Sequence, residues 1–241
     1  MIESCIEKPG SSPFRLYWKN AFTQDNNGLK DWKNMQISEK ERITIPNTTK
    51  NVVGHVDSKS ANSKAMHDKF VGLTSHKSVD ESLYVNSMKL LARYNDTEYE
   101  GIIAIDSRNG QNLQNSYEST KHGWKHQCGF SKNQESYLDS LDNSFETLHN
   151  HPNSSLPSRD DIKMLFIRKN QSASNIVCHD LTFYRIEKLK EHEDVVDFID
   201  SVYLKTKKKF LDYSDSRIEY ECSMALMNML EKGGYIKYER R

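Results

Sequence analysis

The stretch Leu148–Ile162 reads LHNHPNSSLPSRDDI and concentrates side chains that bind metals. His149 and His151 are separated by one residue, and side chains two positions apart on a strand point to the same face of a sheet. After a loop that contains prolines, Ser158 and Asp161 have the spacing that places two residues on one face at the start of a helix. Two imidazoles and a carboxylate can form a catalytic zinc site whose fourth position stays open for water. The stretch therefore predicts a strand, a loop and a helix that converge on one zinc ion.

The order His-x-His-Pro, loop, Ser-x-x-Asp resembles the signature of the JAB/MPN metallopeptidases, the JAMM group that includes deubiquitinase-type isopeptidases. The letters HNHP and PSRDDI are most similar to RadC-type bacterial proteins and to JAB domains of phage minor-head proteins. Six residues separate His151 from Ser158, one fewer than in the family pattern. The resemblance implies an α/β fold with a mixed β-sheet flanked by helices. It also implies that His149, His151 and Asp161 bind zinc and that Ser158 donates a hydrogen bond to the oxyanion.

The JAMM motif also requires a glutamate upstream of the histidines. The segment Glu98–Asp106, EYEGIIAID, resembles the family's Glu-x-x-Gly start of a hydrophobic strand and the RadC-type spacing of a glutamate eight residues before an aspartate. Both alignments select Glu98 rather than Glu100. A carboxylate beside a zinc-bound water can take its proton and pass it to the leaving amine. The alternative is that Glu98 is a solvated residue at the start of a strand, which is usual for a glutamate before an apolar run.

The composition limits which classes of partner and which cellular compartment we expect. Lys+Arg and Asp+Glu each count 34, so no overall charge draws the chain to nucleic acid or to a membrane surface. The four cysteines are far apart and include no CxxC pair, which indicates a reducing compartment. The N-terminal sequence lacks a signal-peptide pattern, and no apolar stretch is long enough for a membrane span. We therefore expect a cytoplasmic protein, and the resemblance implies a protein or peptide substrate, such as a ubiquitin-like conjugate, and an association with phage or prophage.

Three regions follow one another along the chain. Residues 1–80 are polar without a sustained period and are expected to form an N-terminal arm of unassigned role. Residues 81–188 form the predicted JAB/MPN-like catalytic domain, and residues 189–241 form a helical extension with two apolar stripes. The patterns predict helices at 83–93 and 136–143 and one that begins at Ser158, strands at 101–105, 145–149, 175–178 and 182–186, a hairpin turn at Asn109-Gly110, and two C-terminal helices followed by a strand.

Other residue groups indicate other chemistry less strongly. His122 and His126, with Cys128 nearby, have a spacing that a helix could use for a second metal, but two glycines interrupt the segment. Cys178-His179 suggests a thiol nucleophile with its base, although adjacent strand residues face opposite sides. The letters HNH also name a nuclease family, in which the three residues are dispersed over a ββα-metal unit instead of being contiguous.

Two classes of function remain open. The first is a zinc-dependent metallopeptidase or isopeptidase that hydrolyses an amide bond through a water activated by Glu98. The second is a JAB-fold module without enzymatic activity, for instance in phage head assembly or another mobile-element process. The complete ligand set and the candidate base favour the first class. The lysines within residues 205–209 are more typical of a solvated face than of a nucleic-acid contact.

Overall fold

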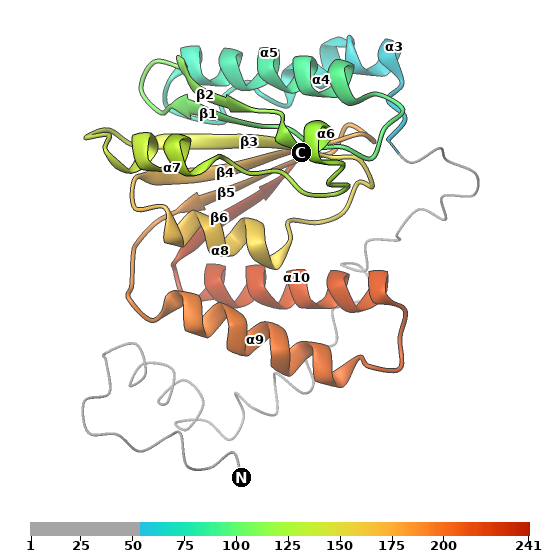
Figure 1. The fold of residues 1–241 in the computed structure, drawn as a ribbon, viewed down its shortest axis with the longest axis vertical. Coiled ribbons are helices and arrows are strands. Elements are labelled where there is room, and N and C mark those ends of the chain that lie inside the picture. Colours follow the sequence, from blue (N-terminus) through green and yellow to red (C-terminus); the bar gives the residue numbers. More distant parts are fainter. Residues whose placement is uncertain (1–53) are drawn as a thin grey trace. The chain divides into compact units, whose positions relative to one another are not determined.

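The computed structural model describes residues 54–241, which form a mixed α/β fold with a six-stranded sheet flanked by helices (Figure 1). The strands lie in the order β2-β1-β3-β4-β5-β6. Their bounds are β1 Ile102–Asp106, β2 Asn112–Ser116, β3 Phe145–His151, β4 Gln171–Cys178, β5 Phe183–Lys188 and β6 Ile236–Arg240. Strands β3 and β4 are parallel, and the other neighbouring pairs are antiparallel. The mixed sheet with flanking helices confirms the predicted α/β class.

The parallel strands β3 and β4 are connected by helix α8 (Arg159–Ile167). Parallel neighbours need such a crossover, because a tight turn reverses the direction of the chain. Ser158 caps the N-terminus of α8, and Ile162 and Leu165 are buried on the side of the helix that contacts the sheet. The crossover thus brings the C-terminal end of β3 and the first turn of α8 together on one face of the sheet.

The other face of the sheet is covered by helix α5 (Lys77–Tyr94), which contacts β1, β3 and β4 (Figure 1). The short helices α3 (Ser58–Ala61) and α4 (Lys64–Asp68) precede it. One apolar cluster joins these helices to the strands: Val56, Ala61, Met66, Phe70, Leu73, Val79, Leu83, Leu90, Leu91, Tyr94, Ile103, Ile105, Leu148, Val177 and Phe183. Residues 54–80, which the sequence assigns to the polar arm, therefore contribute to this core. Residues 1–53 of the expected arm lie outside the described residues.

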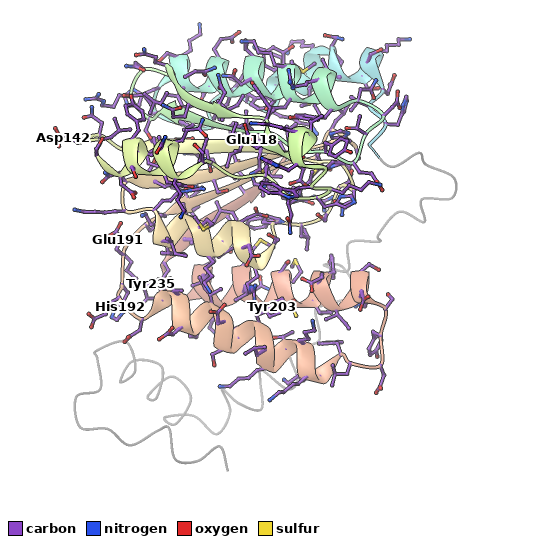
Figure 2. All side chains as sticks on the ribbon, viewed as in Figure 1. Glu118, Asp142, Glu191, His192, Tyr203 and Tyr235 are labelled. Atoms are coloured by element: carbon purple, nitrogen blue, oxygen red, sulfur yellow. The ribbon has the colours of Figure 1, made fainter. Side chains whose placement is uncertain are left out.

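The C-terminal helices α9 (Val195–Lys209) and α10 (Asp215–Lys232) extend the layer that α8 begins (Figure 1). Helix α10 packs against α9, α8 and β6. Tyr203 of α9, labelled in Figure 2, donates a hydrogen bond to Glu219 of α10. Strand β6 pairs with β5 and forms one edge of the sheet. The predicted helical extension therefore completes both the sheet and one of its covering layers.

Two smaller helices, α6 (Glu118–His122) and α7 (Lys132–Asp139), lie between β2 and β3 in the chain. Helix α7 begins earlier than the helix predicted at 136–143, because Ser131 forms a capping box at its start. The predicted hairpin turn between β1 and β2 is present, and Gly110 there has a φ of 76°, which glycine adopts without strain. The strand predicted to end at His149 continues to His151, so both histidines lie on β3.

Candidate metal centre

His149 and His151 lie at the end of β3 and point to the face of the sheet that α8 covers. Leu148 belongs to the apolar cluster beneath α5, and strand residues alternate between the two faces. The alternation therefore sends both histidines to the α8 side and Asn150 to the α5 side. Asp161 lies in the first turn of α8, on the same side of the sheet. The loop and helix that follow β3 thus bring the carboxylate back to the two imidazoles.

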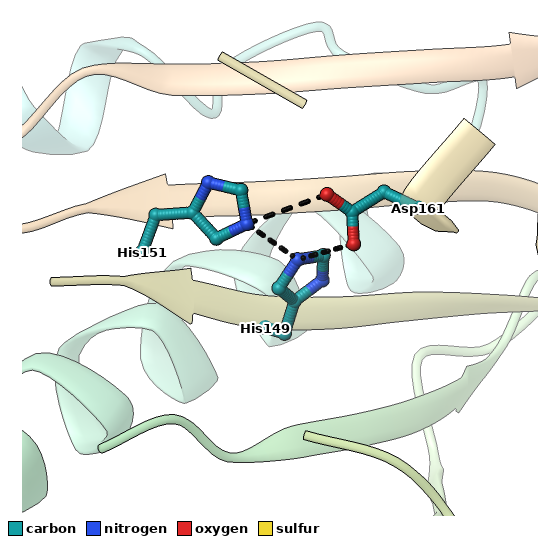
Figure 3. A group of neighbouring side chains, drawn as sticks. All are labelled: His149, His151 and Asp161. Atoms are coloured by element: carbon teal, nitrogen blue, oxygen red, sulfur yellow. Dashed lines mark hydrogen bonds and ion pairs between the residues drawn. The ribbon is translucent and has the colours of Figure 1, made fainter. Parts of the chain in front are cut away.

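The three side chains converge on one point (Figure 3). The Nε2 atoms of His149 and His151 are 3.0 Å apart. Asp161 Oδ1 lies 3.1 Å from His149 Nε2, and Asp161 Oδ2 lies 3.4 Å from His151 Nε2. Three ligands that hold a zinc ion tetrahedrally at about 2.0–2.1 Å are roughly 3.3 Å from one another. The observed separations therefore fit three ligands of one ion, as the sequence predicts for these residues.

The loop after β3 fixes which nitrogen of His151 faces the cluster. His151 Nδ1 lies 3.1 Å from the carbonyl oxygen of Ser155 and 3.1 Å from its Oγ. When Nδ1–H donates to that carbonyl, Nε2 keeps its lone pair and points it at the cluster, as is usual for a metal-binding histidine. His149 also presents Nε2 to the cluster, and its Nδ1 is buried without a hydrogen-bond partner among residues 54–241.

The charges of the cluster perturb one another strongly. Burial disfavours the ionised form of Asp161, but His149 and His151 outweigh this effect and hold the pKa of Asp161 well below its ordinary value. Burial likewise disfavours protonation of His151, yet the hydrogen bond and the charge of Asp161, together with Glu100, raise the pKa of His151 to about 9. A proton on an imidazole therefore balances the buried carboxylate. A divalent cation bound by neutral imidazoles could balance the same charge, so the residues fit a metal.

The pairing of β1 with β3 separates the two candidate glutamates. Ile102 lies opposite His149 in this antiparallel pair. Continuing the same register by two residues sets Glu100 opposite His151, and residues directly opposite each other point to the same face. The same continuation carries Glu98 past the last residue of β3. The register therefore directs Glu100, and not Glu98, toward the metal ligands.

Glu98, which the sequence alignments select as the base, has other partners. Its carboxylate forms an ion pair with Lys125, and His126 Nε2 lies 3.8 Å from it. The hydrogen bond from Lys125 is the main cause that lowers the pKa of Glu98, and His126 contributes to the same shift. None of the three metal-ligand candidates is among the groups that perturb Glu98. The structure therefore does not bring Glu98 into the cluster.

Glu100 is buried beside the cluster. Burial raises the pKa of Glu100, and the charges of His151 and His149 partly offset the rise. Its backbone N–H donates to Ser119 Oγ at 3.1 Å. A buried carboxyl group with a raised pKa, beside two candidate metal-ligand imidazoles, is a stronger base than a solvated carboxylate. The motif alignments pass over this residue, because they count spacing along the chain and not pairing between strands.

Ser158 is the N-cap of α8 and forms a capping box with Asp161. Ser158 Oγ accepts a hydrogen bond from Asp161 N at 3.1 Å, and Ser158 N donates to Asp161 Oδ2 at 2.7 Å. These bonds orient the carboxylate and occupy a lone pair of the hydroxyl without using its proton. The short loop after His151 therefore still sets Ser158 beside a metal-ligand candidate. Asp160 is exposed and pairs with Arg159 at 2.9 Å, which agrees with Asp161 as the ligand of this turn.

The second metal site considered at His122 and His126 does not assemble. His122 Nε2 lies 3.0 Å from Glu118, and His126 lies near Glu98. Burial, followed by the charges of Glu100 and Asp161, raises the pKa of the Cys128 thiol well above its ordinary value, so it stays protonated. In the part of the chain that the structure describes, His149, His151 and Asp161 are the only group of three whose ligand atoms lie close enough for one ion.

The pair Cys178-His179 does not form a nucleophile and its base. Cys178 Sγ lies 3.7 Å from the carbonyl oxygen of Ser155, on the α8 side of the sheet. Both ring nitrogens of His179 are engaged elsewhere, Nδ1 with the carbonyl oxygen of Gly54 and Nε2 with the side chain of Asn150. The alternation of strand side chains separates the two residues, as the sequence predicts.

No protein-family model, curated protein or solved structure matches the chain significantly. Among residues 54–241, no helix is both long enough and apolar enough to cross a membrane. What the protein does must then be inferred from the chemistry of the site.

Proposed function

We propose that this protein is a zinc-dependent metallopeptidase or isopeptidase of the JAB/MPN type. It hydrolyses an amide bond in a protein or peptide substrate, and the resemblance of its motif implies ubiquitin-like conjugates as the first class to try. The observation that carries the proposal is the convergence of His149, His151 and Asp161 on one point, with the buried Glu100 beside them. Three protein ligands leave one position of a tetrahedral ion open, which is the arrangement of catalytic zinc.

Different residues would have different roles in the proposed amide hydrolysis. A bound zinc ion would supply Lewis-acid activation of a water molecule and of the scissile carbonyl. Glu100 would accept a proton from the attacking water and deliver it to the amine that leaves, because an amide breaks only when its nitrogen is protonated. Ser158 would donate its hydroxyl proton to the oxyanion that develops on the carbonyl. The capping box that holds Ser158 also orients Asp161, so both groups keep a fixed geometry.

We assign the base to Glu100 rather than to Glu98 for two reasons. The strand register, continued by two residues, favours Glu100 on the face of the metal-ligand candidates, and burial raises its pKa, which makes it a stronger base than a solvated carboxylate. Glu98 would first have to leave its ion pair with Lys125. This pair lowers the pKa of Glu98 and so makes it a weaker base.

The test measures metal content and amide cleavage together. We expect stoichiometric zinc in the wild-type protein and cleavage of ubiquitin-like conjugates or peptides that stops with a chelator and returns with added zinc. Glu100→Gln should stay folded and zinc-loaded but lose roughly 10²–10⁴-fold in cleavage rate. Glu98→Gln is the matched control and should cleave at the wild-type rate.

Two outcomes would change the proposal. An inactive Glu98→Gln beside an active Glu100→Gln would return the base to Glu98. A zinc-loaded wild type that cleaves no conjugate or peptide would favour the second class, a JAB-fold module without enzymatic activity.

A further inference from the structure

Asn150 stands between the two histidine ligands but points to the opposite face of the sheet. Its carboxamide binds the backbone on both sides of Glu100: Oδ1 accepts from Gly101 N at 2.9 Å, and Nδ2 donates to Tyr99 O at 3.1 Å. The side chain of Asn150 is fully buried. One residue of the ligand strand therefore holds the two peptide groups that flank the proposed base.

His179 fixes the orientation of the Asn150 carboxamide. Its Nε2 lies 3.0 Å from Asn150 Nδ2, and its Nδ1 lies 2.6 Å from the carbonyl oxygen of Gly54. A carbonyl only accepts, so Nδ1 carries the proton and Nε2 is the acceptor for the amide N–H. The buried imidazole thus selects the orientation in which Asn150 Oδ1 faces Gly101 N.

Gly54 anchors the far end of this chain of hydrogen bonds. Its φ is 84°, and a Cβ at this position would collide with the carbonyl group of Thr97, so glycine is required. Gly54 O also accepts from Asp96 N at 2.7 Å, and Gly54 N donates to Pro152 O at 3.2 Å. These backbone contacts hold the carbonyl in the place where His179 Nδ1 reaches it.

We infer that Asn150 and His179 are positioning residues that hold Glu100 at the metal centre. The inference rests on the proposed function, in which Glu100 is the base. These contacts matter because β1 begins at Ile102, so Glu100 precedes the regular β1–β3 ladder. The backbone groups beside Glu100 therefore need other hydrogen-bond partners. Asn150 supplies these partners from the same strand that carries the two imidazoles. Base and ligands are therefore held in register by one side chain.

A purely structural role for Asn150 makes a different prediction, and Asn175 provides the matched control. Asn175 is also a buried asparagine on the α5 side of the sheet, but its carboxamide binds Glu146, Arg185 and the carbonyl oxygen of Thr147. Its replacement removes as many buried hydrogen bonds without touching the segment around Glu100. A general loss of stability should therefore affect both variants, and a positioning effect should affect one.

The first experiment measures amide hydrogen exchange and needs no substrate. The Gly101 amide should exchange at least tenfold faster in Asn150→Ala than in wild type, while zinc content stays stoichiometric. It should also exchange faster in His179→Ala, and it should be unchanged in Asn175→Ala. Unchanged protection of Gly101 in Asn150→Ala overturns the inference whether or not a substrate is known.

The second experiment is a double-mutant cycle on cleavage of the substrate identified for the wild type. Asn150→Ala should lower kcat roughly 10²-fold with KM nearly unchanged, because a small displacement of a reacting group costs about that much. In the Glu100→Gln background the same substitution should cause no further loss. An equal loss in both backgrounds, or an equal loss in Asn175→Ala, shows a structural role. If Glu100→Gln retains full activity, the assignment of the base fails instead.

Discussion

Strand β3 carries two buried polar clusters on opposite faces, and they solve the same electrostatic problem differently. On the α5 side, both terminal nitrogens of Arg185 donate to Glu146, with Nη2 at 2.9 Å from Oε1. Asn175 Nδ2 donates to Glu146 Oε2 at 3.0 Å. A guanidinium is a permanent cation whose planar donors match a carboxylate. The charge of this cluster is therefore balanced within the chain.

On the α8 side, the buried carboxylate of Asp161 meets two imidazoles. His149 Nε2 and His151 Nε2 face one another, and in a neutral ring Nε2 is an acceptor when the proton is on Nδ1. Neutral rings supply no charge opposite to that of the carboxylate. The negative charge of Asp161 is then balanced by a proton taken up from solvent or by a metal cation. Burial of charge alone therefore does not mark a functional site. The informative property is a buried carboxylate whose partners are titratable imidazoles, because a metal cation can take the place of their proton.

The largest expected effect is on metal binding. His149→Ala or His151→Ala should abolish stoichiometric zinc, because the remaining protein ligands hold it poorly. Asp161→Ala should weaken binding similarly, and Asp160→Ala, on the exposed side of the same turn, should bind zinc as wild type does. Elemental analysis and zinc titration measure this. Stoichiometric zinc in His149→Ala would contradict the ligand assignment.

Substitutions in the Glu146–Arg185 cluster, on the α5 side, should change the stability of the fold and leave the metal content unchanged. Glu146→Ala leaves the Arg185 guanidinium buried and unpaired and should cost about 3–5 kcal/mol in the free energy of unfolding. Zinc per folded molecule should not change. Replacing both partners, with Glu146→Leu and Arg185→Met, should recover part of this loss, because no buried charge is left unpaired although Asn175 Oδ1 loses its donor. Denaturant unfolding of chelator-treated protein measures the stability of both variants. Loss of zinc in Glu146→Ala without loss of stability would contradict a purely structural role for this cluster.

Ser158→Ala should separate the helix cap from the chemistry. Loss of the oxyanion donor should lower turnover roughly 10²-fold while zinc stays bound. Loss of the N-cap should lower stability by about 1 kcal/mol. Steady-state kinetics and thermal unfolding on one preparation give both numbers. Turnover equal to wild type, with the stability loss present, would leave Ser158 with the capping role alone.

The smallest effect is the pH dependence of the metal-free protein. The pKa of His151 is about 9 in the folded chain, above its ordinary value of 6.5, so folding favours the bound proton. This stability should be fully present below pH 6.5 and should fall as the pH rises toward 9. Zinc affinity should change in the opposite direction, because metal binding needs neutral imidazoles.

Unfolding of chelator-treated protein between pH 6 and 9 checks this prediction. His151→Gln should lack the decline, because it removes the titrating group. A metal-free wild type whose stability is constant over this interval would show that the cluster does not bind the proton.

Local patterns predicted the metal-ligand candidates, whereas pairing between distant segments favours Glu100 over Glu98 as the candidate base. The spacing of His149 and His151 and the Ser-x-x-Asp cap act within one strand and one helical turn, so the sequence contains them. The choice between Glu98 and Glu100 depends on the register of β1 against β3, which is set by contacts far apart in the chain. The sequence alone indicates no role for Asn150, because its partners also come from distant segments.

The same limit applies to residues 54–80. Their apolar side chains are sparse and have no sustained period, so the sequence indicates a polar arm. In the structure Val56, Met66 and Phe70 pack into the core beneath α5, where Phe183 of β5 contacts Phe70. Short helices α3 and α4 take their place from these tertiary contacts and not from helical propensity.

The three metal-ligand candidates all come from residues 149–161, whereas the Gly101 amide beside Glu100 meets Asn150 across 49 positions of sequence. Closing a short loop costs little chain entropy, and pairing distant strands costs more. Under the proposed function, a nascent or partly unfolded chain can therefore bind metal before Glu100 is held beside it. Metal occupancy would then report only on the part of the site that forms first. A preparation with full metal occupancy could still contain molecules in which Glu100 is not held beside the metal.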